Sequence, residues 1–416
     1  MVLVTYEIIN KVHKLGFGFK DIDFNLSSLF YMDDGPIFTK NMHDMEQLIF
    51  RIQNICIKYG LQLNKSKCKI LSFNVKDKLE TCSGIEIVQK KKSLGILIDN
   101  KRKCFESYKQ KKIEDGLKFS NILYSFLGNS VNRLLVGKTY WKGAVLPNIM
   151  YGSDVINYNA SELSKIQVVE NKAYRLILQV PYYTANSFLR GEIGASSSKS
   201  RDMKNKILFL KHCFKTDTNS LLNDIITKDF ENELTPWLKT VKSYLKDLKL
   251  ALNDVLFLSD QLITDKIYAE DSKLWRQDIE SKVTLNLYRN KLEISEIKWF
   301  RNHPKYYIMM RARSNTLDLE WRNRNTNENK TCKLCNLEIE TLSHFLLNCY
   351  ILQDIRNSCS PFQLPRIEND LELLKELLLF ENKYGIKPHF YIDLLCNLWQ
   401  AGTNFLKLED ASFYGF

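Results

Sequence analysis

The first hundred residues combine short apolar runs with one amphipathic segment. Four short runs are bounded by Gly, Asn, Asp or Lys, a pattern that predicts strands. They cover residues 25–30, 37–39, 69–75 and 94–98. Between them, apolar residues recur at spacings of three and four from Met45 to Cys56, which predicts a helix that Gly60 ends. This part of the chain is therefore expected to be mixed α and β.

The pattern after residue 104 is helical. Apolar positions repeat at helical spacing up to about residue 190, and a Ser- and Gly-rich stretch at 191–200 predicts a boundary. From Trp237 to Leu256 apolar residues step by three and four, which predicts one amphipathic helix. The expected fold class is α+β. Its predicted segments are 1–104, 105–190, 191–324, 325–360 and 361–416, the last made of closing helices.

Length, apolar content and charge exclude some classes of protein and favour others. The chain has 416 residues, 44% of them apolar, and a net charge of +12 from 60 Lys and Arg against 48 Asp and Glu. At about 150 residues per domain, this length predicts two or three domains, and the apolar content excludes a disordered tail. The positive charge favours a polyanionic partner, with RNA or DNA first and an anionic membrane surface second.

The sequence carries no signal for a membrane or for secretion. No apolar run approaches the roughly 18 to 20 residues of a membrane-spanning helix, so we expect no membrane partner. The first ten residues lack the regions of a secretory signal, so we expect a protein that is not secreted. A protein that is not secreted is expected in a reducing compartment, so the scattered cysteines are interpreted as buried thiols. These are Cys56, Cys68, Cys82, Cys104, Cys213 and Cys396.

Asp33 and Asp34 lie between two apolar runs, at the tip of an expected hairpin whose turn is residues 32–35. A hairpin of this kind can hold one carboxylate on a divalent cation and the next in its outer shell, as phosphoryl transfer by two Mg²⁺ ions requires. The alternative is an ordinary turn, because Asp and Gly are favoured at turns for local reasons.

Four possible metal ligands are grouped near the carboxyl end of the sequence. Cys332, Cys335, His344 and Cys349 have the spacing Cys-x2-Cys-x8-His-x4-Cys. Three thiolates and one imidazole complete a tetrahedral shell for Zn²⁺ and leave no position for water, so the predicted site is structural and its folding depends on metal. Coincidence is the alternative. Cys359 lies outside the spacing and is interpreted as a spare thiol.

Basic residues are dense between positions 58 and 112. Fifteen Lys and Arg face five acids there, a local net charge of +10. Such density suits phosphate contacts that hold a duplex without reading its sequence, and it predicts salt-dependent binding. Lys65, Lys67 and Lys69 alternate toward an expected strand, so they are expected to share one face. A solvated surface is the alternative.

Several motifs in order resemble the reverse transcriptases of non-LTR (LINE-type) retrotransposons. Residues 31–34, Tyr-Met-Asp-Asp, resemble the Tyr-x-Asp-Asp box of reverse transcriptases, and residues 60–64 follow at a plausible distance. Residues 93–98, Ser-Leu-Gly-Ile-Leu-Ile, resemble the Leu-Gly hairpin that grips the primer in this family. The helical region around residues 151–153 and 169–184 and the Cys/His cluster, which resembles a zinc-knuckle-like motif, extend the similarity over roughly the whole chain.

The resemblance implies an RNA-directed DNA polymerase with an RNA template and a DNA primer or target as partners. It implies a partial palm (1–104), a helical thumb-like region (105–190), a helical linker domain (191–324) and a zinc-knuckle-like module (325–360). Asp33 and Asp34 are then catalytic and bind Mg²⁺, and a nuclear or cytoplasmic ribonucleoprotein is expected. The implied nucleic-acid-binding residues are Tyr31, Lys65, Lys67, Lys69, Lys90, Lys91, Lys92, Leu94 and Gly95.

The sequence departs from the family at its beginning. In the family, the fingers and the first palm carboxylate precede the Tyr-x-Asp-Asp box, whereas 30 residues precede Tyr31 here. We therefore expect an amino-terminally truncated polymerase that is inactive alone. Gly35 and Pro36 also replace the usual apolar strand residues. Two alternatives stay open: a non-enzymatic zinc-containing RNA- or DNA-binding protein derived from such an element, and a helical zinc-containing interaction protein.

Overall fold

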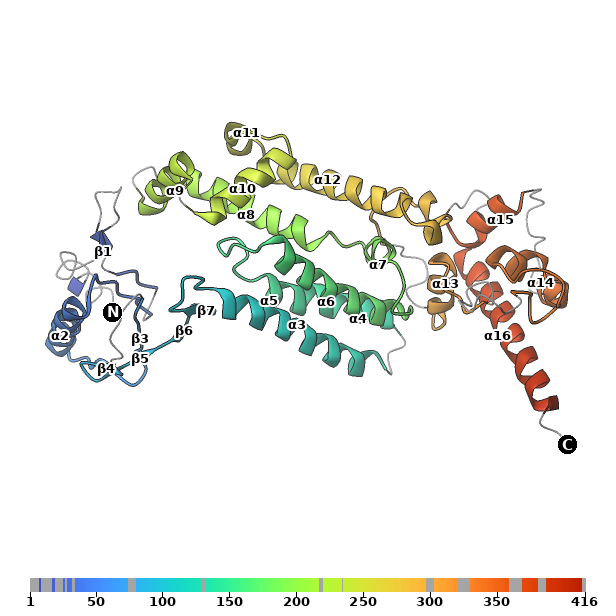
Figure 1. The fold of residues 1–416 in the computed structure, drawn as a ribbon, viewed down its shortest axis with the longest axis horizontal. Coiled ribbons are helices and arrows are strands. Elements are labelled where there is room, and N and C mark those ends of the chain that lie inside the picture. Colours follow the sequence, from blue (N-terminus) through green and yellow to red (C-terminus); the bar gives the residue numbers. More distant parts are fainter. Residues whose placement is uncertain are drawn as a thin grey trace. The chain divides into compact units, whose positions relative to one another are not determined.

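The computed structural model contains many helices and a few short strands (Figure 1), which confirms the expected α+β class. Two compact units are formed. Unit 1 comprises Met1–Lys112, Gly152–Asn157 and Asn205–Phe257, and unit 2 comprises Ile113–Tyr151, Tyr158–Lys204 and Leu258–Phe416. The finer division into five consecutive segments stays a prediction. The described residues are 7–8, 17–18, 25–26, 28–31, 34–73, 80–128, 132–216, 220–233, 235–296, 303–319, 330–358, 369–380 and 387–413.

The strands belong to unit 1 and are shorter than the apolar runs that predicted them. β1 (Phe17–Gly18) pairs antiparallel with β2 (Asn25–Leu26). β3 (Ile70–Leu71) lies parallel to β5 (Ile85–Val88), and β4 (Thr81–Cys82) pairs antiparallel with the other side of β5. A separate antiparallel pair consists of β6 (Lys90–Ser93) and β7 (Ile96–Asp99). The expected strand at 37–39 contributes a single bridge, Ser28 to Ile37.

The helix α2 (Met42–Lys58) forms as the sequence predicts and carries the core beside these strands. Asn41 caps its start, because the Asn41 side-chain oxygen accepts a hydrogen bond from the backbone N–H of Asp44 at 2.8 Å. The positive φ of Gly60 follows its end. Its buried side chains are Leu48, Ile49, Ile52, Ile55 and Cys56. Of these, Ile49 packs in one cluster with Ile70 and Ile85 of the three-stranded sheet.

Unit 1 also contains helices from later in the sequence. They are the second part of α8 (Ser198–Lys215), α9 (Leu221–Asn232), α10 (Pro236–Asp247) and α11 (Leu252–Phe257). The ring of Phe209 on α8 meets the ring of Trp237 on α10 edge to face, with centroids 6.0 Å apart. The Trp237 indole N–H donates to the carbonyl oxygen of Asp154 at 2.7 Å, so the buried indole is also satisfied as a donor.

The helix predicted from Trp237 to Leu256 is in fact two helices. α10 ends at Asp247, and Lys249 adopts a left-handed backbone with φ of +54°. The backbone N–H of Leu250 donates back to the carbonyl of Leu245 at 2.9 Å, which closes the helix end. The apolar spacing continues through this break, so periodicity alone did not reveal it.

The helices of unit 2 begin with the greater part of α3 (Glu106–Leu127), which packs closely on its neighbours (Figure 1). A Cβ atom at Gly116 of α3 would lie 2.9 Å from side-chain atoms of both Ile149 and Val169. A Cβ atom at Gly137 would lie 2.7 Å from Ile177. The absence of a side chain at Gly116 and Gly137 therefore allows their helices to lie this close to the neighbouring side chains. The elements are α4 (Arg133–Tyr140), the π-helical turn η2 (Trp141–Val145), α5 (Leu146–Met150), α6 (Ala160–Leu178) and α7 (Asn186–Ile193).

The carboxyl-terminal part of unit 2 is also helical. The expected closing helices correspond to α15 and α16, and α16 contacts α13. No helix among the described residues is long and apolar enough to cross a membrane. The elements are α12 (Asp260–Glu280), η3 (Val283–Leu285), η4 (Tyr288–Asn290), α13 (Tyr306–Arg313), η6 (His344–Asn348), η7 (Tyr350–Leu352), α14 (Gln353–Ser358), α15 (Asp370–Leu377) and α16 (Pro388–Phe413).

The short helix α7 is buried on most sides and places two charged residues inside unit 2. The Arg190 guanidinium lies 2.7 Å from a carboxylate oxygen of Asp271 on α12. One carboxylate oxygen of Glu192 lies 3.0 Å from Arg313 on α13 and 3.4 Å from Lys291. Burial acts to raise the pKa of Glu192, but the two cations outweigh it and lower the pKa below its usual value. Glu192 is thus a buried, ionised carboxylate.

The Ser- and Gly-rich stretch at 191–200 lies inside unit 2. Gly194, with φ of +66°, ends α7. The backbone N–H of Ser197 then donates to Asp271 at 3.0 Å, and the Ser198 hydroxyl donates to the carbonyl of Leu163 at 2.9 Å. These small polar residues satisfy buried hydrogen-bonding groups where the chain turns from α7 to α8.

We expect Gly191→Ala to destabilise the protein. The new Cβ atom would lie 2.3 Å from the Tyr288 hydroxyl oxygen and 2.9 Å from the Trp275 ring, and neither stiff aromatic side chain can bend away. Such overpacking costs about 1–3 kcal/mol. The matched control is Gly143→Ala, where no atom lies within 4 Å of the new methyl group. Urea unfolding measures both, and equal midpoints for the two variants would contradict the expectation.

Candidate metal centre and nucleic-acid interface

The four predicted zinc ligands lie together in unit 2. Cys332, Cys335, His344 and Cys349 are all buried, and one possible ligand atom from each lies within 4.8 Å of all the others. Cys332 and Cys335 belong to a loop that folds back on itself. His344 begins the π-helical turn η6, and Cys349 follows its end. The four residues that the spacing predicted as ligands therefore lie together in the structure.

Local backbone hydrogen bonds explain how the first two cysteines are presented. Thr331 and Ile339 form an antiparallel bridge across the loop. Inside it, the N–H of Cys332 donates to the carbonyl of Glu338 at 2.6 Å. Asn336 adopts φ of +55°, and its N–H donates to the carbonyl of Cys332 at 2.8 Å, which turns the chain tightly after Cys335. Both thiols point into the same space as a result.

The distances fit a tetrahedral zinc ion. Tetrahedral ligands with Zn–S bonds of about 2.3 Å stand about 3.8 Å apart, and an imidazole nitrogen stands slightly closer to sulfur. The Sγ atoms of Cys332 and Cys349 are 4.0 Å apart. The Sγ atom of Cys335 is 3.3 Å from Nε2 of His344. Donor type, number, burial and spacing all suit a closed structural Zn²⁺ site.

Glu338 orients the histidine ligand. Its carboxylate lies 3.0 Å from Nδ1 of His344, so Nδ1 is the nitrogen that carries the proton and Nε2 presents its lone pair toward the three thiols. A carboxylate behind a ligating imidazole is the usual support of zinc-bound histidine. Sequence reasoning identified the four ligands but missed Glu338, for which the only signal was its position six residues before His344.

Metal binding at this site is coupled to proton release. Burial raises the pKa of Cys332 to about 12 and also raises the pKa of Cys349. Burial acts in the same direction on Cys335, but other groups, first the backbone N–H groups of Leu337 and Glu338, lower its pKa to about 7. Two of the three thiols therefore keep their protons at neutral pH unless a cation displaces them.

The metal centre is packed against α16. The ring of Phe345 meets the ring of Trp399 at a centroid distance of 5.9 Å. A Cβ atom at Gly402 would lie 3.1 Å from Phe345, so only glycine allows α16 to approach this closely without displacement of the ring. On another side, Arg356 of α14 donates to the carbonyl oxygen of Cys349. Both α14 and α16 therefore contact the segment that carries the metal ligands.

The Tyr-Met-Asp-Asp segment is described in part. Asp33, with Met32, lies outside the described residues. Tyr31 and Asp34 form an antiparallel bridge, with the Tyr31 N–H donating to Asp34 at 2.8 Å and the Asp34 N–H donating to Tyr31 at 3.1 Å. Both of these side chains are exposed, with Tyr31 at 62%. Asp34 is therefore held in a bridge with Tyr31, and its side chain is open to solvent.

The hairpin formed by β6 and β7, here called the Lys hairpin, contains Lys90, Lys91, Lys92 and the Leu94-Gly95 tip. Leu94 has φ of +45° and Gly95 has φ of +86°, which are the two positive values that a tight two-residue turn needs. Leu94 is half exposed despite its apolar side chain. Lys90 and Lys92 are exposed on one face of β6, while Lys91 is partly covered on the other face.

The other predicted lysines do not share a strand face. Lys65 and Lys67 lie in a turn, and Lys69 directly precedes β3. Lys65 donates to the carbonyl of Ser83 at 2.9 Å, and Lys69 pairs with Glu86. The prediction of a shared face was wrong because residues two apart share a face only within a strand, and Lys65 and Lys67 precede the strand. Internal partners thus occupy Lys65 and Lys69.

Asp99 anchors the Lys hairpin to the start of α3. Its carboxylate is buried, accepts a hydrogen bond from the backbone N–H of Ser107 at 3.0 Å and lies 3.8 Å from the Lys90 ammonium. Its own N–H donates to the carbonyl of Cys104 at 2.7 Å, which closes the loop between β7 and α3. Sequence reasoning counted Asp99 only as an acid within a basic stretch and missed this role.

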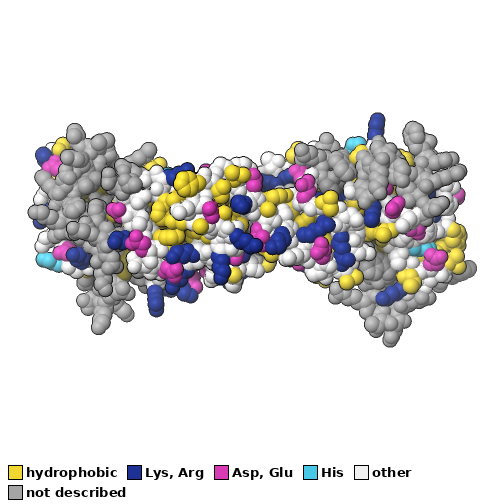
Figure 2. Space-filling view, turned by 90° about the horizontal axis from the view of Figure 1, so that it is seen from above, with side chains coloured by type: hydrophobic (Ala, Val, Ile, Leu, Met, Phe, Trp, Pro, Cys, Tyr) yellow, Lys and Arg dark blue, Asp and Glu magenta, His cyan; other side chains and the backbone are white. Residues whose placement is uncertain are grey.

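Positively charged side chains are mixed with acidic ones on some parts of the surface and clustered on others. Within the helical parts visible in Figure 2, Lys and Arg side chains alternate with Asp and Glu side chains. Around the Lys hairpin, in contrast, Lys101, Arg102 and Lys103 add three consecutive exposed cations to Lys90 and Lys92. This part of unit 1 is the stronger candidate for contact with a polyanion.

Comparisons with protein-family models, with curated proteins and with solved structures found no match for this chain. The resemblance to reverse transcriptases therefore stays a prediction.

We expect the purified protein to bind one zinc ion and Cys335→Ser to reduce its zinc content severalfold, because three remaining donors cannot close the tetrahedral shell. Cys68→Ser, which changes a half-buried thiol outside the cluster, is the control and should keep its zinc. Elemental analysis measures both. Zinc removal by a chelator should also change tryptophan fluorescence, since Trp399 packs on the module. Equal zinc contents in the two variants would exclude this site.

Proposed function

We propose that this chain binds RNA and DNA as part of a non-LTR retrotransposon reverse transcriptase. The observation that carries the proposal is the Lys hairpin, in which exposed Lys90 and Lys92 share one face and the Leu94-Gly95 pair forms the turn at the tip. This is the geometry expected of a hairpin that holds a primer strand. In this proposal, unit 1 includes the palm-derived part and α3 begins the thumb-like helical region.

The spacing along β6 supports phosphate contact. Alternate residues of a strand point to the same face and are about 6.8 Å apart, so Lys90 and Lys92 place two positive charges on one side of β6. The Lys90 ammonium donates to the Ser107 hydroxyl at 2.6 Å and lies 3.8 Å from Asp99, so it helps hold the base of the hairpin on α3. Lys92 is then the cation of β6 that is available for a phosphate.

The zinc module is proposed as a second nucleic-acid contact. Its loop exposes Lys330 and Lys333 together with the apolar side chain of Leu337, and Tyr350 is exposed just after the last ligand. Cations for phosphates beside apolar and aromatic groups for bases are the combination that single-stranded nucleic acids require. Zinc would act there by holding the loop in shape rather than by catalysis.

Catalysis is proposed for Asp33 and Asp34, which would hold Mg²⁺ for nucleotidyl transfer. The exposed side chain of Asp34, whose backbone is bridged to Tyr31, is compatible with a metal ligand. Two-metal transfer also needs a carboxylate on a facing strand, and we assign no residue to that role. A second candidate function is therefore nucleic-acid binding without polymerisation, which the Lys hairpin and the zinc module support independently of the aspartates.

We expect Lys92→Gln to weaken binding to an RNA–DNA hybrid and to lower the slope of log affinity against log salt by about 0.9, the value for one phosphate contact. Lys92 is a suitable site because it makes no hydrogen bond or ion pair within the described part of the chain. Lys239→Gln, at an exposed position on α10, is the control for loss of one charge. Fluorescence anisotropy over a salt series measures both slopes. An unchanged slope for Lys92→Gln would count against the hairpin.

We expect a divalent cation to bind at Asp34, which Fe²⁺ in place of Mg²⁺ can report by oxidative cleavage of the nearby backbone. Cleavage near residue 34 should fall as Mg²⁺ is added and should be lost in Asp34→Asn. Glu46→Gln, at an exposed acid on α2, should retain it. Mg²⁺-dependent primer extension on an RNA template is the second readout, and any extension should stop in Asp34→Asn. Equal cleavage in both variants would remove the aspartates from the proposal and leave the binding function.

A further inference from the structure

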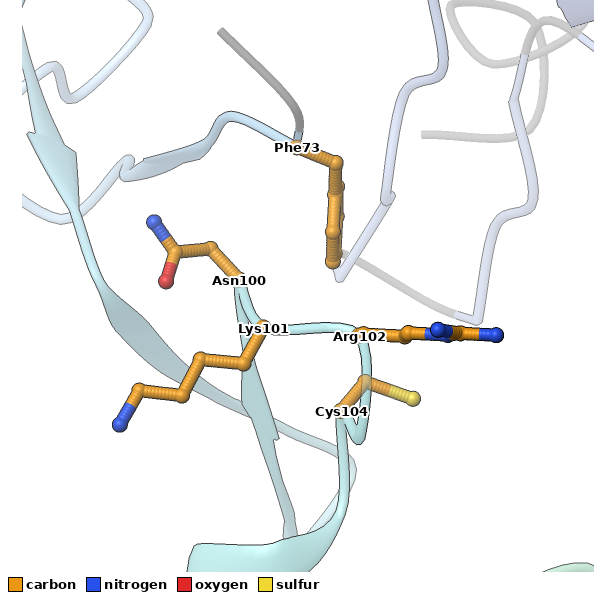
Figure 3. A pocket seen from close by; sticks show the side chains of 5 residues that line it. All are labelled: Phe73, Asn100, Lys101, Arg102 and Cys104. Carbon is orange, nitrogen blue, oxygen red and sulfur yellow. The ribbon is translucent and has the colours of Figure 1, made fainter. Parts of the chain in front are cut away.

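A pocket of about 420 Å³ opens in unit 1 beside the base of the Lys hairpin. Phe73 lines it from one side, and the loop between β7 and α3 lines it from the other. Figure 3 shows Phe73 reaching toward this loop, with Arg102 and Cys104 directed to the same side and Lys101 to the opposite side. The lining residues are Phe73, Asn100, Lys101, Arg102 and Cys104.

The topology places this pocket at one edge of the parallel strand pair. β3 and β5 run in the same direction, so their carboxyl ends lie at a common edge. Phe73 follows the end of β3. Gln89 follows the end of β5, and its carbonyl accepts a hydrogen bond from the N–H of Asn100 at 2.9 Å. The hydrogen bond between Asn100 and Gln89 therefore holds the pocket loop at this edge.

The loop that carries Arg102 is closed at its base. The backbone N–H of Asp99 donates to the carbonyl of Cys104 at 2.7 Å, and the buried Asp99 carboxylate accepts from the N–H of Ser107. Asn100, Lys101 and Arg102 therefore extend from a short loop whose two ends are joined. A site built on a supported loop loses less conformational entropy when a ligand binds.

The lining residues select the class of ligand. Among the described residues the lining includes two cations and no acid, and the Arg102 guanidinium lies on the same side as Cys104, so this part of the pocket favours an anion. The Phe73 ring is 48% exposed and offers an apolar face, and Asn100 offers both a donor and an acceptor. Burial raises the pKa of Cys104, so its neutral thiol adds no negative charge that would repel an anion. A nucleotide, in which a sugar joins a phosphate to a planar base, offers a partner both to Arg102 and to the Phe73 ring, whereas inorganic phosphate leaves the Phe73 face uncovered.

We propose that this pocket binds one unstacked nucleotide of a single-stranded nucleic acid, with the base on Phe73 and the phosphate on Arg102. The inference rests on the proposed function and adds the ligand of a particular site. Lys92 and Lys90 lead along β6 from its tip toward the base of the hairpin, and Lys90 is linked through Asp99 to the pocket loop. A backbone held on these lysines can continue into the pocket.

The test compares two probes of equal length and charge: an oligouridylate of about ten nucleotides and the same backbone with abasic sugars. Phe73→Leu should weaken binding of the oligouridylate about 5- to 150-fold, the loss that removal of one stacked base contact produces, and should leave the abasic probe unchanged. Phe50→Leu, at an exposed phenylalanine on α2, is the matched control. Arg102→Gln should weaken both probes more than Lys103→Gln, which removes the same charge from a residue that does not line the pocket.

The outcomes separate the pocket from the proposed function. Equal affinity of the wild-type protein for the two probes, or equal effects of Phe73→Leu and Phe50→Leu, would overturn the pocket while nucleic-acid binding stands. Absence of any binding by the folded wild-type protein would overturn both. As an independent readout, the oligouridylate should slow alkylation of Cys104 and not of Cys68, a half-buried thiol outside the pocket. Equal alkylation rates of Cys104 with and without the oligouridylate would contradict occupancy of the pocket.

Discussion

The cost of burying charge fixes the arrangement of unit 2. An ion removed from water and left without its partner costs about 3–5 kcal/mol, so Glu192 and Asp271 can be buried only with their cations in place. Arg190 and Glu192 stand two residues apart on α7, whereas their partners come from α12, from Lys291 and from α13. One eight-residue helix thus specifies how three later segments pack. Apolar contacts alone tolerate small shifts that these pairs do not.

Positive charge in this protein serves two separate purposes. Lys65 and Lys69 bond to groups within unit 1, and Arg356 donates to the backbone of the zinc module, so they hold the fold together. Lys92 and the three cations at 101–103 are exposed beside the Lys hairpin. The net charge of +12 is therefore a poor guide to the binding surface. The cations without internal carboxylate or carbonyl partners mark that surface more closely.

Short-range spacing predicted several features correctly, whereas contacts between residues far apart in the sequence could not be predicted from it. The face of α2 and the four zinc ligands follow from spacing within a few residues, whereas the hairpin at Leu94-Gly95 was expected only from the resemblance, since the apolar run itself predicted a strand over 94–98. The break at Lys249 depends on one left-handed residue that leaves the apolar period intact, so periodicity missed it. The partnership of Glu192 with Arg313 joins residues 121 positions apart, and no local pattern encodes it. The role of Asp99 could not be predicted because its partners, Cys104 and Ser107, approach it only in the folded loop between β7 and α3.

The dependence of α16 on the zinc module has a consequence for the order of synthesis. The four metal ligands lie within a stretch of 18 residues, so closing the module orders only a short loop and needs no residue from later in the sequence. Phe345, which Trp399 and Gly402 cover, is therefore translated and can be held in place by metal before those residues leave the ribosome. A nascent chain starved of zinc would instead offer α16 no formed surface, which exposes its apolar face to chaperones and proteases.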